Sequence, residues 1–445
     1  MTDDRRLIRE KLEQATTILD EFDVDLWLTF VRETMLVTDP ALELIYDGDV
    51  TWQSAFLIGR DGRRTAIIGH FDAENVRALG AYTNIVDYHE GVAQPLLEAL
   101  TDHAPRSIAI NYSEDDVAAD GLTHGMYRLL TGYLADTPWA ANLTSAAPII
   151  AALRGRKTPA EIERVRRAVE TTERVFDEIE AFVRPGMTQK QIADFVHERI
   201  DGMGLDYAWP KPFNPIVTCG PESAMGHAAP GDVVLQRGHT FHIDLGIKQN
   251  GYCSDIQRMW YVLEEGEDTA PPAVQRAFDV VLGAIEVGEA ALCCGVAGWQ
   301  VDEVAREFIV DNGYPEYMHA FGHLLGRSAH DGATVLGPRW ERYKGICDLE
   351  VEAGNIFTLE LHVVVPERGM MSLEEDVIVT ETGVDYLSTP RRACVIFASG
   401  CQGFRTAAGK RSRLGKSPVG RCDLILATRI GINSEISYSL GPMVN

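Results

Sequence analysis

Two aspartates, Asp244 and Asp255, stand eleven residues apart in the segment FHIDLGIKQNGYCSD. Apolar residues alternate with polar ones around Asp244, which predicts a β-strand with one buried face. Asn250-Gly251 predicts a type I′ hairpin turn, because both central residues of that turn need positive φ. In the register that this turn sets, Asp244 faces Gln257, and the two aspartates are diagonal neighbours roughly 7 Å apart at the backbone. Two carboxylates in this position could hold a pair of metal ions, although a single hairpin also fits two solvated polar side chains.

Three further segments carry residue types that bind metal ions. The segment HAFGHLLGRSAHD places three histidines in a short glycine-interrupted loop. The segment NIFTLELHVVV predicts a buried strand with one acid, Glu360, whose burial is costly unless something pairs with it. The segment LEEDVIVT predicts another strand with acids clustered at its start. Taken singly, these segments also fit a polar loop, an edge-facing glutamate and a solvated strand end. Taken together with the hairpin, one histidine and four carboxylates make a hard-ligand set that suits Mn²⁺, Co²⁺ or Zn²⁺.

The sequence patterns around these residues predict helices and strands arranged in two α/β units. With 445 residues and 45% hydrophobic content, the chain is long enough for two globular domains. Residues 1–150 predict an α/β unit that contains a hairpin turned at Asp61-Gly62. Residues 151–397 begin with a long amphipathic helix, for which Thr158 is the expected N-cap and Glu161 completes a capping box. Strands, glycine-rich loops and helices then alternate, and this second unit holds all of the candidate ligands.

Composition argues against several classes of function. A net charge of −25 argues against nucleic acid or an anionic membrane surface as a partner. No long apolar run predicts a transmembrane helix, and the charged N-terminus lacks the apolar centre of a signal peptide, so we expect a cytoplasmic protein. The eight cysteines form no CxxC pair, which favours reduced thiols. Residues 398–445, with seven basic and two acidic side chains and no sustained period, predict a poorly ordered basic tail.

Taken in their order along the chain, the hairpin, the histidine loop and the acidic strands resemble motifs of the pita-bread metallopeptidases. These are aminopeptidase P, prolidase and methionine aminopeptidase, with creatinase as a metal-free relative. DLGIKQNGYCSDIQR resembles the family's DxG…GYxSDxTR hairpin, HAFGHLLGRSAHD its HGxGHxxGxxxHE loop, and LEEDVIVT its IEDxVLVT strand. The resemblance covers most of residues 1–395. It implies an α/β (α+β) fold with a creatinase-like N-terminal domain and a pita-bread catalytic domain. It also implies two divalent ions, Mn²⁺ first and Co²⁺ or Zn²⁺ as alternatives. The implied ligands are Asp244, Asp255, His323, Glu360 and Glu374, with Glu374 selected over Glu375.

The same resemblance implies a second group of residues near the substrate. His227, in SAMGHAAP, fits the family's HxxP element, while His319 opens the histidine loop and His330 closes it. His227 and His330 would line the substrate site and steady the charged tetrahedral intermediate, and Glu360 would carry a proton toward the leaving nitrogen. An ordinary loop or core histidine remains the alternative for His227 and for His330. Three histidines match no family position and are predicted to be purely structural: His239, His242 and His362.

The implied function is hydrolysis of the Xaa-Pro bond of small peptides or dipeptides through a metal-bridging hydroxide. A homodimer is expected from the same resemblance. Two departures from the family pattern bear on specificity. Glu360-Leu361-His362 stands where the family has EPG, and Ser372 stands where proline-specific members carry arginine. These departures leave two alternatives open: a creatinase-like C–N hydrolase or lyase that acts on a small non-peptide substrate, and a non-catalytic binding scaffold.

Overall fold

The computed structural model describes residues 3–397 and 405–406. The tail predicted to be poorly ordered, residues 398–445, lies outside the described residues except for the short strand β19 (Arg405–Thr406). Within the described ranges, no helix combines the length and the apolar character that crossing a membrane requires.

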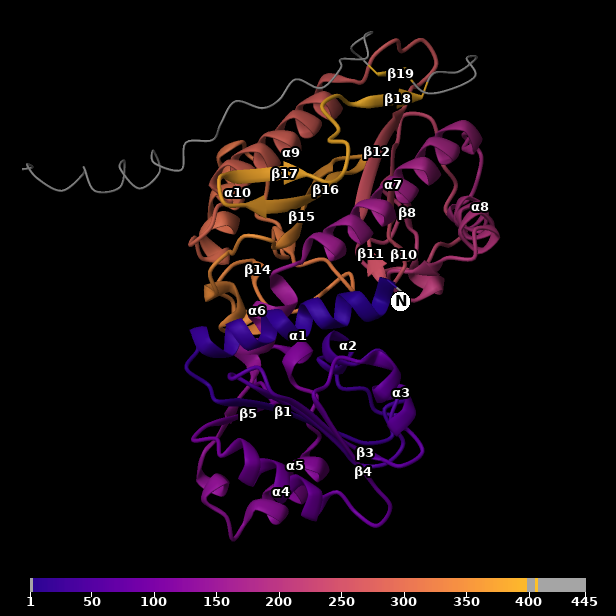
Figure 1. The fold of residues 1–445 in the computed structure, drawn as a ribbon. Coiled ribbons are helices and arrows are strands. Elements are labelled where there is room, and N and C mark those ends of the chain that lie inside the picture. The colour runs from indigo at the N-terminus through magenta and orange to yellow at the C-terminus, as the bar shows by residue number, and fades with distance from the viewer. Residues whose placement is uncertain (1–2, 398–404, 407–445) are drawn as a thin grey trace, which may run out of the picture.

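The N-terminal part of the chain is a single mixed sheet covered by helices on both faces (Figure 1). Its strands are β1 (Leu26–Val31), β2 (Ser54–Gly59), β3 (Arg64–Gly69), β4 (Asn84–Tyr88), β5 (Ile108–Ile110) and β6 (Leu143–Ser145). Its helices are α1 (Asp3–Glu21), α2 (Leu42–Ile45), α3 (Ala73–Leu79), α4 (Ala93–His103), α5 (His124–Leu134) and α6 (Ala147–Gly155). The strand order is β4-β3-β2-β1-β5-β6, and β2 and β3 form the predicted hairpin, with Gly62 at a φ of 84°.

The alternation of side chains along each strand explains why helices cover both faces of this sheet. Trp27 and Phe56 point to one face, where they pack with α1, α2, α3 and α6. Leu28 and Leu57, one position further along the same strands, point to the other face and pack with α4 and α5. Because neighbouring residues of a strand face opposite sides, continuous apolar strands need helices on both.

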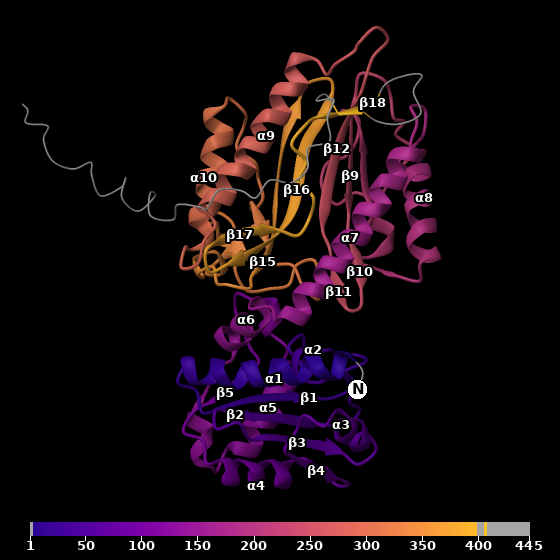
Figure 2. The ribbon, with the colours of Figure 1, turned by 45° about the horizontal axis from the view of Figure 1, so that its top comes forward.

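The C-terminal part contains two larger sheets that lie side by side, with helices on their outer faces (Figure 2). Its strands are β7 (Asp206–Tyr207), β8 (Ile216–Cys219), β9 (Thr240–Leu245), β10 (Ile247–Gln249), β11 (Tyr252–Cys253), β12 (Ile256–Val262), β13 (Gly322–His323), β14 (Val335–Leu336), β15 (Ile356–Val365), β16 (Gly369–Thr380), β17 (Gly383–Tyr386) and β18 (Val395–Phe397). Its helices are α7 (Pro159–Phe182), α8 (Gln189–Gly202), α9 (Pro272–Ala291) and α10 (Gly298–Asp311).

The two larger sheets meet along β12 and β16. One sheet has the order β19-β18-β12-β9-β8, and the other has the order β15-β16-β17. Helix α9 packs against β15 and β16, whereas α7 and α8 pack against the strands of the first half of this part. Since β9, β12, β15 and β16 lie next to one another, side chains on their common face can converge on one point.

The predicted hairpin forms in the predicted register, but the strands are interrupted. Asp244 pairs with Gln257, and Asn250 and Gly251 have φ values of 52° and 78°. The sequence predicted one continuous hairpin, whereas the structure ends β9 at Leu245 and resumes as β10, which joins β11 and β7 in a separate small sheet. At the interruption the Ser254 hydroxyl accepts a hydrogen bond from the Ile247 amide at 3.1 Å. At this break Asp255 is not paired in the hairpin, and its amide instead donates a hydrogen bond to Asp376 in the neighbouring sheet.

Helix α7 begins as its sequence predicts. The Thr158 hydroxyl accepts a hydrogen bond from the Glu161 amide, and the Glu161 carboxylate accepts one from the Thr158 amide at 2.8 Å. Glu161 is buried and also binds Lys11 at 2.8 Å and the Tyr252 hydroxyl at 2.9 Å. The capping residue therefore ties the start of α7 to both α1 and the hairpin.

Candidate active site

Side chains from several strands converge on one cavity of the C-terminal part. The cavity has a volume of about 440 Å³, and its wall includes all five residues predicted to bind metal. Asp244 lies in β9 and Asp255 in the link between β11 and β12. His323 lies in β13, Glu360 in β15 and Glu374 in β16.

Three of these residues form an especially compact group. Asp255, His323 and Glu374 each present a ligand atom within 4.8 Å of the others. The His323 Nε2 atom also lies 3.6 Å from Glu360 Oε1, and β15–β16 pairing places Glu360 directly opposite Glu374. The structure thus brings together residues that are up to 130 positions apart between Asp244 and Glu374.

Burial and mutual repulsion shape the charge of this cluster. Burial is the largest cause that raises the pKa of Asp244, Asp255 and Glu374 well above the usual carboxyl range, and repulsion from neighbouring carboxylates adds to it. Burial also raises the pKa of Glu360. Burial lowers the pKa of His323 to about 3, so its imidazole is neutral near pH 7. Four carboxylates can ionise together here only if positive charge compensates them.

The residues present fit divalent cations. Two buried carboxylate oxygens, Asp244 Oδ1 and Glu374 Oε2, make no hydrogen bond to the described residues. Buried polar atoms nearly always have a hydrogen-bond partner. Two buried oxygens without one in the same cavity therefore indicate a site for a bound cation. Carboxylate oxygens with a neutral imidazole nitrogen are the donors that Mn²⁺, Co²⁺ and Zn²⁺ accept.

Strand alternation separates the three consecutive acids of β16. Glu374 faces the cluster, whereas Glu375 points away and binds the buried Arg258 at 3.1 Å and the Ser388 hydroxyl at 2.6 Å. Asp376 lies on the same side as Glu374 and accepts a hydrogen bond from the Asp255 amide at 3.2 Å. Asp376 therefore positions Asp255. Its place two residues after Glu374 on the same strand could have predicted that both acids face the cluster.

A buried network behind Glu360 was not predicted from the sequence. The Gln257 amide donates a hydrogen bond to Glu360 Oε2 at 2.8 Å. Gln257 Oε1 in turn accepts hydrogen bonds from the Ser372 hydroxyl and from His242 Nε2, the latter at 3.0 Å. The Ser372 hydroxyl oxygen also lies 3.1 Å from the Leu361 carbonyl oxygen, the alternative acceptor for its single hydrogen. Ser372 thus holds Gln257, and Gln257 holds Glu360.

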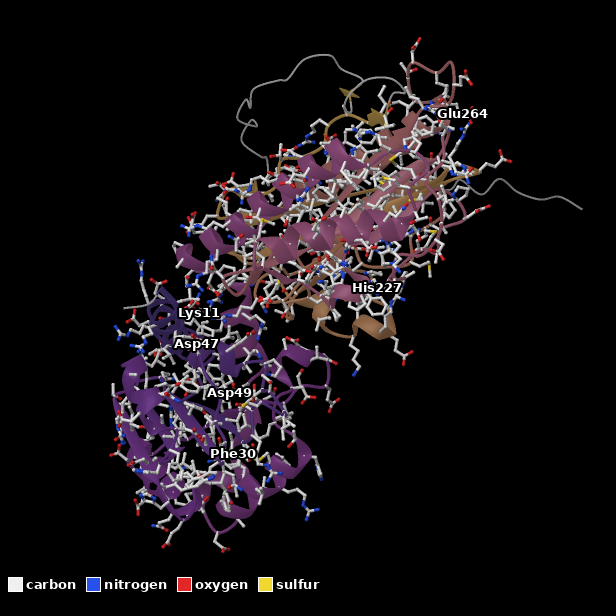
Figure 3. The ribbon with its side chains drawn as sticks, turned by 90° about the vertical axis from the view of Figure 1, so that its right-hand side faces the viewer. Lys11, Phe30, Asp47, Asp49, His227 and Glu264 are labelled. Carbon is white, nitrogen blue, oxygen red and sulfur yellow. The ribbon has the colours of Figure 1, made fainter. Side chains whose placement is uncertain are left out.

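His227 and His330, predicted to line the substrate site, and His319, which opens the histidine loop, lie in the same region. His227 and His330 border both the ligand cavity and an adjoining cavity of about 540 Å³, and His319 borders the larger one. The His330 ring packs against His323 with ring centres 4.3 Å apart. Figure 3 places His227 on the side of the C-terminal part toward the N-terminal part, whereas Glu264 lies at the far end.

Two histidines predicted to be purely structural belong to the wall of the larger cavity: His242 and His362. The prediction missed this placement. His362 Nδ1 lies 3.1 Å from His319 Nε2, and the two rings stack. Because His242 precedes Asp244 by two residues and His362 follows Glu360 by two, alternation places each on the face of its ligand. His239 borders neither cavity.

A buried ionic network anchors the histidine loop to the N-terminal part. Asp331, directly after His330, binds Arg154 at 2.7 Å and Lys157 at 2.8 Å. Arg154 reaches on to Glu43 in α2 at 3.1 Å. Asp116, from the N-terminal part, also accepts a hydrogen bond from the Ala333 amide at 2.9 Å and lines the larger cavity. The position of the loop therefore depends on both parts of the chain.

Comparison with known proteins identifies relatives of this arrangement. The model of metallopeptidase family M24 matches residues 163–381. An uncharacterized peptidase of Staphylococcus saprophyticus is 27% identical over 384 residues, which cover 85% of this chain and 99% of that protein. An uncharacterized peptidase of Bacillus subtilis is 28% identical over 267 residues, which cover 59% of this chain and 69% of that protein.

Solved structures share the whole architecture. An Xaa-Pro dipeptidase from Bacillus anthracis has a TM-score of 0.68 at 23% identity, and the match covers 88% of this chain and 100% of that one. An X-Pro aminopeptidase from Thermotoga maritima has a TM-score of 0.64 at 24% identity, with 87% and 99% covered. At this level of identity the likeness establishes the fold. The predicted combination of an N-terminal α/β sheet and a C-terminal pita-bread domain is confirmed.

Proposed function

We propose that this chain, which belongs to metallopeptidase family M24 through residues 163–381, hydrolyses the Xaa-Pro bond of peptides or dipeptides with the help of two divalent ions. The observation that carries the proposal is the convergence of four carboxylates, two buried and two half-buried, and one neutral imidazole on a single cavity. We also propose residues 1–150 and 151–397 as its two domains, with the boundary inside α6, whose last residues still pack on the N-terminal sheet, and a homodimer as its assembly.

The ions would be held by the five converging residues, with Mn²⁺ as the first expectation: Asp244, Asp255, His323, Glu360 and Glu374. When bound, divalent ions supply Lewis acidity and lower the pKa of water so that hydroxide is available near neutral pH. The unpaired oxygens of Asp244 and Glu374 support their assignment as ligands.

The surrounding residues would handle the substrate and its protons. Glu360 has one oxygen held by Gln257 and the other turned toward His323, so its carboxylate is fixed in orientation at the cavity wall. A fixed carboxylate there can take a proton from the attacking water and pass it to the leaving nitrogen. His330 and His227 would donate hydrogen bonds to the carbonyl oxygen as negative charge builds on it, and His319 would line the path of the peptide.

Preference for proline rests on two observations. Two structures that share the fold are described as an Xaa-Pro dipeptidase and an X-Pro aminopeptidase. His227, which fits the proline branch's HxxP element, borders both cavities. One observation favours a second candidate, a C–N hydrolase or lyase that acts on a small non-peptide substrate: Ser372 is buried in the network behind Glu360 where the proline branch has arginine.

A metal-reconstitution assay tests the proposal. The purified protein would be stripped with chelator, reloaded with Mn²⁺, Co²⁺ or Zn²⁺, and given Xaa-Pro peptides alongside small amidines and betaines. We expect about two ions per chain, as in dinuclear hydrolases, together with restored cleavage of the Xaa-Pro bond. Turnover of only the small compounds would favour the second candidate, and absence of bound metal would refute the metal-dependent peptidase proposed here.

A further inference from the structure

The ring of His330 is placed by its backbone and not by a partner of its own. The side chain is exposed in the cavity wall, and among the described residues no hydrogen bond or ion pair reaches its ring nitrogens. The ring packs edge-on against that of His323, with ring centres 4.3 Å apart. The direction in which His330 can donate a hydrogen bond is therefore set by the conformation of the chain on either side of it.

Asp331, the next residue, closes the loop and fastens it to the segment between the two parts. Its amide donates a hydrogen bond to the Leu324 carbonyl at 2.9 Å, and its carboxylate accepts one from the Ser328 amide at 3.3 Å. The same carboxylate binds Arg154, near the end of α6, at 2.7 Å and Lys157, two residues after α6, at 2.8 Å. All three charged side chains are at most 3% exposed, so water cannot replace either ion pair.

The two residues after Asp331 take the left-handed backbone conformation, with φ of 73° at Gly332 and 58° at Ala333. An alanine at positive φ is unfavourable and persists only where its surroundings hold it. The Ala333 amide donates a hydrogen bond to the Asp116 carboxylate at 2.9 Å. A Cβ atom added at Gly332 would lie 2.3 Å from the Cβ atom of Ala118. The N-terminal part therefore holds the backbone of the loop two and three residues after the exposed histidine.

These contacts form two separate links from the N-terminal part to one short segment. Asp116 caps a 3-10 helix of the N-terminal part (Val117–Ala119) by accepting a hydrogen bond from the Ala118 amide, so the orientation of its carboxylate is fixed. Arg154 is fixed as well, because it also binds Glu43 in α2 at 3.1 Å. A displacement of either side chain would therefore move the segment that carries the histidine.

We propose, on the basis of the function proposed above, that Asp116, Arg154 and Lys157 are positioning residues for His330. Through the loop they set the direction from which its ring donates a hydrogen bond to the substrate carbonyl as negative charge develops there. Within the described part of the chain, none of the three forms a hydrogen bond or ion pair with a predicted metal ligand. A displacement of about 1 Å at a group that contacts the substrate can lower the rate on the order of 100-fold. Their effect on turnover thus passes through His330 and leaves the metal ligands in place.

A double-mutant cycle on the metal-loaded full chain, with an Xaa-Pro peptide as substrate, tests this inference. Asp116→Ala should lower kcat by roughly 10-fold or more, with a smaller change in KM and the metal content maintained. In a His330→Ala background the same substitution should change kcat by less than about 2-fold, because its effect requires the histidine. Asp116→Asn, which keeps one acceptor oxygen for the Ala333 amide, should recover part of the loss. An equal loss in both backgrounds would overturn the inference, since it would show a role unrelated to His330.

Two neighbouring cations supply a second comparison, which decides the matter if the His330 variant is too slow to measure. Lys157→Met removes one of the two cations at Asp331, and kcat should fall by roughly 10-fold. Arg156→Gln is the matched control, because the Arg156 side chain also joins the two parts. Its hydrogen bonds within the described residues go to Glu21 and Glu352, not to the histidine loop. We expect kcat of the control to stay within about 2-fold of wild type.

Both variants are compared at a temperature at which their thermal transitions show them to be folded. An equal fall of kcat in both would mean that any loosening between the two parts slows turnover. Wild-type kcat in Lys157→Met would mean that the loop needs no such support. Either result overturns the inference and leaves the proposed function standing. Failure of the wild-type protein to cleave the peptide would overturn the proposed function itself, and this inference with it.

Discussion

At the scale of single residues, four carboxylates, two buried and two half-buried, line the ligand cavity together with one neutral imidazole. Their raised pKa values come first from burial and then from repulsion between neighbouring acids. A group of this kind is unstable unless cations neutralise it. Each acid that contacts the cluster should therefore affect metal binding, and each acid that points away should affect only stability.

The adjacent residues Glu374 and Glu375 allow a matched comparison of these two effects. Glu374→Gln should remove a ligand, so the bound metal should decrease and kcat/KM should fall by roughly 100-fold or more. Glu375→Gln removes the nearer of the two carboxylates beside the buried Arg258, leaving Glu173 at 3.9 Å, and should lower the free energy of unfolding by up to roughly 3–5 kcal/mol, while the folded protein keeps its metal. Elemental analysis and urea unfolding distinguish the two. Metal loss in the Glu375 variant but not in the Glu374 variant would show that the ligand is wrongly assigned.

Gln257 offers a test of the network behind Glu360. Gln257→Leu removes the donor to Glu360 Oε2 without removing a predicted ligand. We expect kcat/KM to fall by roughly 10–100-fold, the usual effect of losing an outer hydrogen-bond partner, with the metal content maintained. Ser372→Ala is the milder control, because His242 still holds Gln257 in that variant. Wild-type activity in Gln257→Leu would mean that Glu360 needs no such support.

At the scale of elements, the interrupted hairpin delivers both aspartates. The turn at Asn250 and Gly251 sets the register, and the break after Leu245 frees Asp255 from the strand pairing. The turn itself is distant from the ligands, so its effect on the site passes through the positions of β9 and β12. A weakened turn should therefore reduce stability first and activity second.

A pair of glycine-to-alanine substitutions tests this dependence. Gly251→Ala forces a side chain onto a residue with φ of 78°, which should cost roughly 1–2 kcal/mol of stability. Gly132→Ala, in the exposed face of α5 with open space around it, should instead stabilise by roughly 0.5–1 kcal/mol. Both values can be read from denaturant unfolding. Equal effects of the two substitutions would argue against a strained type I′ turn.

At the scale of the whole molecule, the site depends on the contact between the two parts. Asp331 holds the histidine loop to Arg154 and Lys157, and the wall of the larger cavity includes Asp115 and Asp116. Figure 3 shows Lys11, which binds Glu161, on the edge of the N-terminal part that faces the C-terminal part. The N-terminal part thus both positions catalytic candidates and borders the space that a peptide would occupy.

Metal removal should change the pH dependence of global stability. In the metal-free protein, the folded-state pKa values of Asp244, Asp255 and Glu374 are raised. Folded protein then binds more protons than unfolded protein, so the stability should fall as pH rises above the unfolded values of about 4. Thermal melting of stripped protein should therefore give a lower Tm at pH 8 than at pH 6. Metal at 100 times its Kd should restore about 2.7 kcal/mol. A stripped protein with its highest Tm at pH 8 would contradict this.

Local patterns in the sequence were sufficient to predict several features of the fold and the candidate site. The Asn250-Gly251 turn, the pairing of Asp244 with Gln257 and the capping box at the start of α7 all depend on neighbouring residues, on the strand period of two or on a spacing of three. The five-residue ligand set was implied by the resemblance of the ordered motifs to a known family, and the structure places all five in one cavity. The turn, the strand register and the capping box depend on residues close together in the sequence, so sequence patterns are sufficient to predict them.

Contacts between distant strands could be found only in the tertiary structure. The packing of β12 beside β16 and β15 decides that Gln257 holds Glu360, that Ser372 holds Gln257, and that His362 meets His319. No period along one strand specifies which side chains meet across two sheets, because that depends on how the sheets twist and on which residues fill the space between them. The sequence by itself determined which residues could bind metal. Tertiary packing alone decided which neighbours orient those residues and which side chains line the cavities beside them.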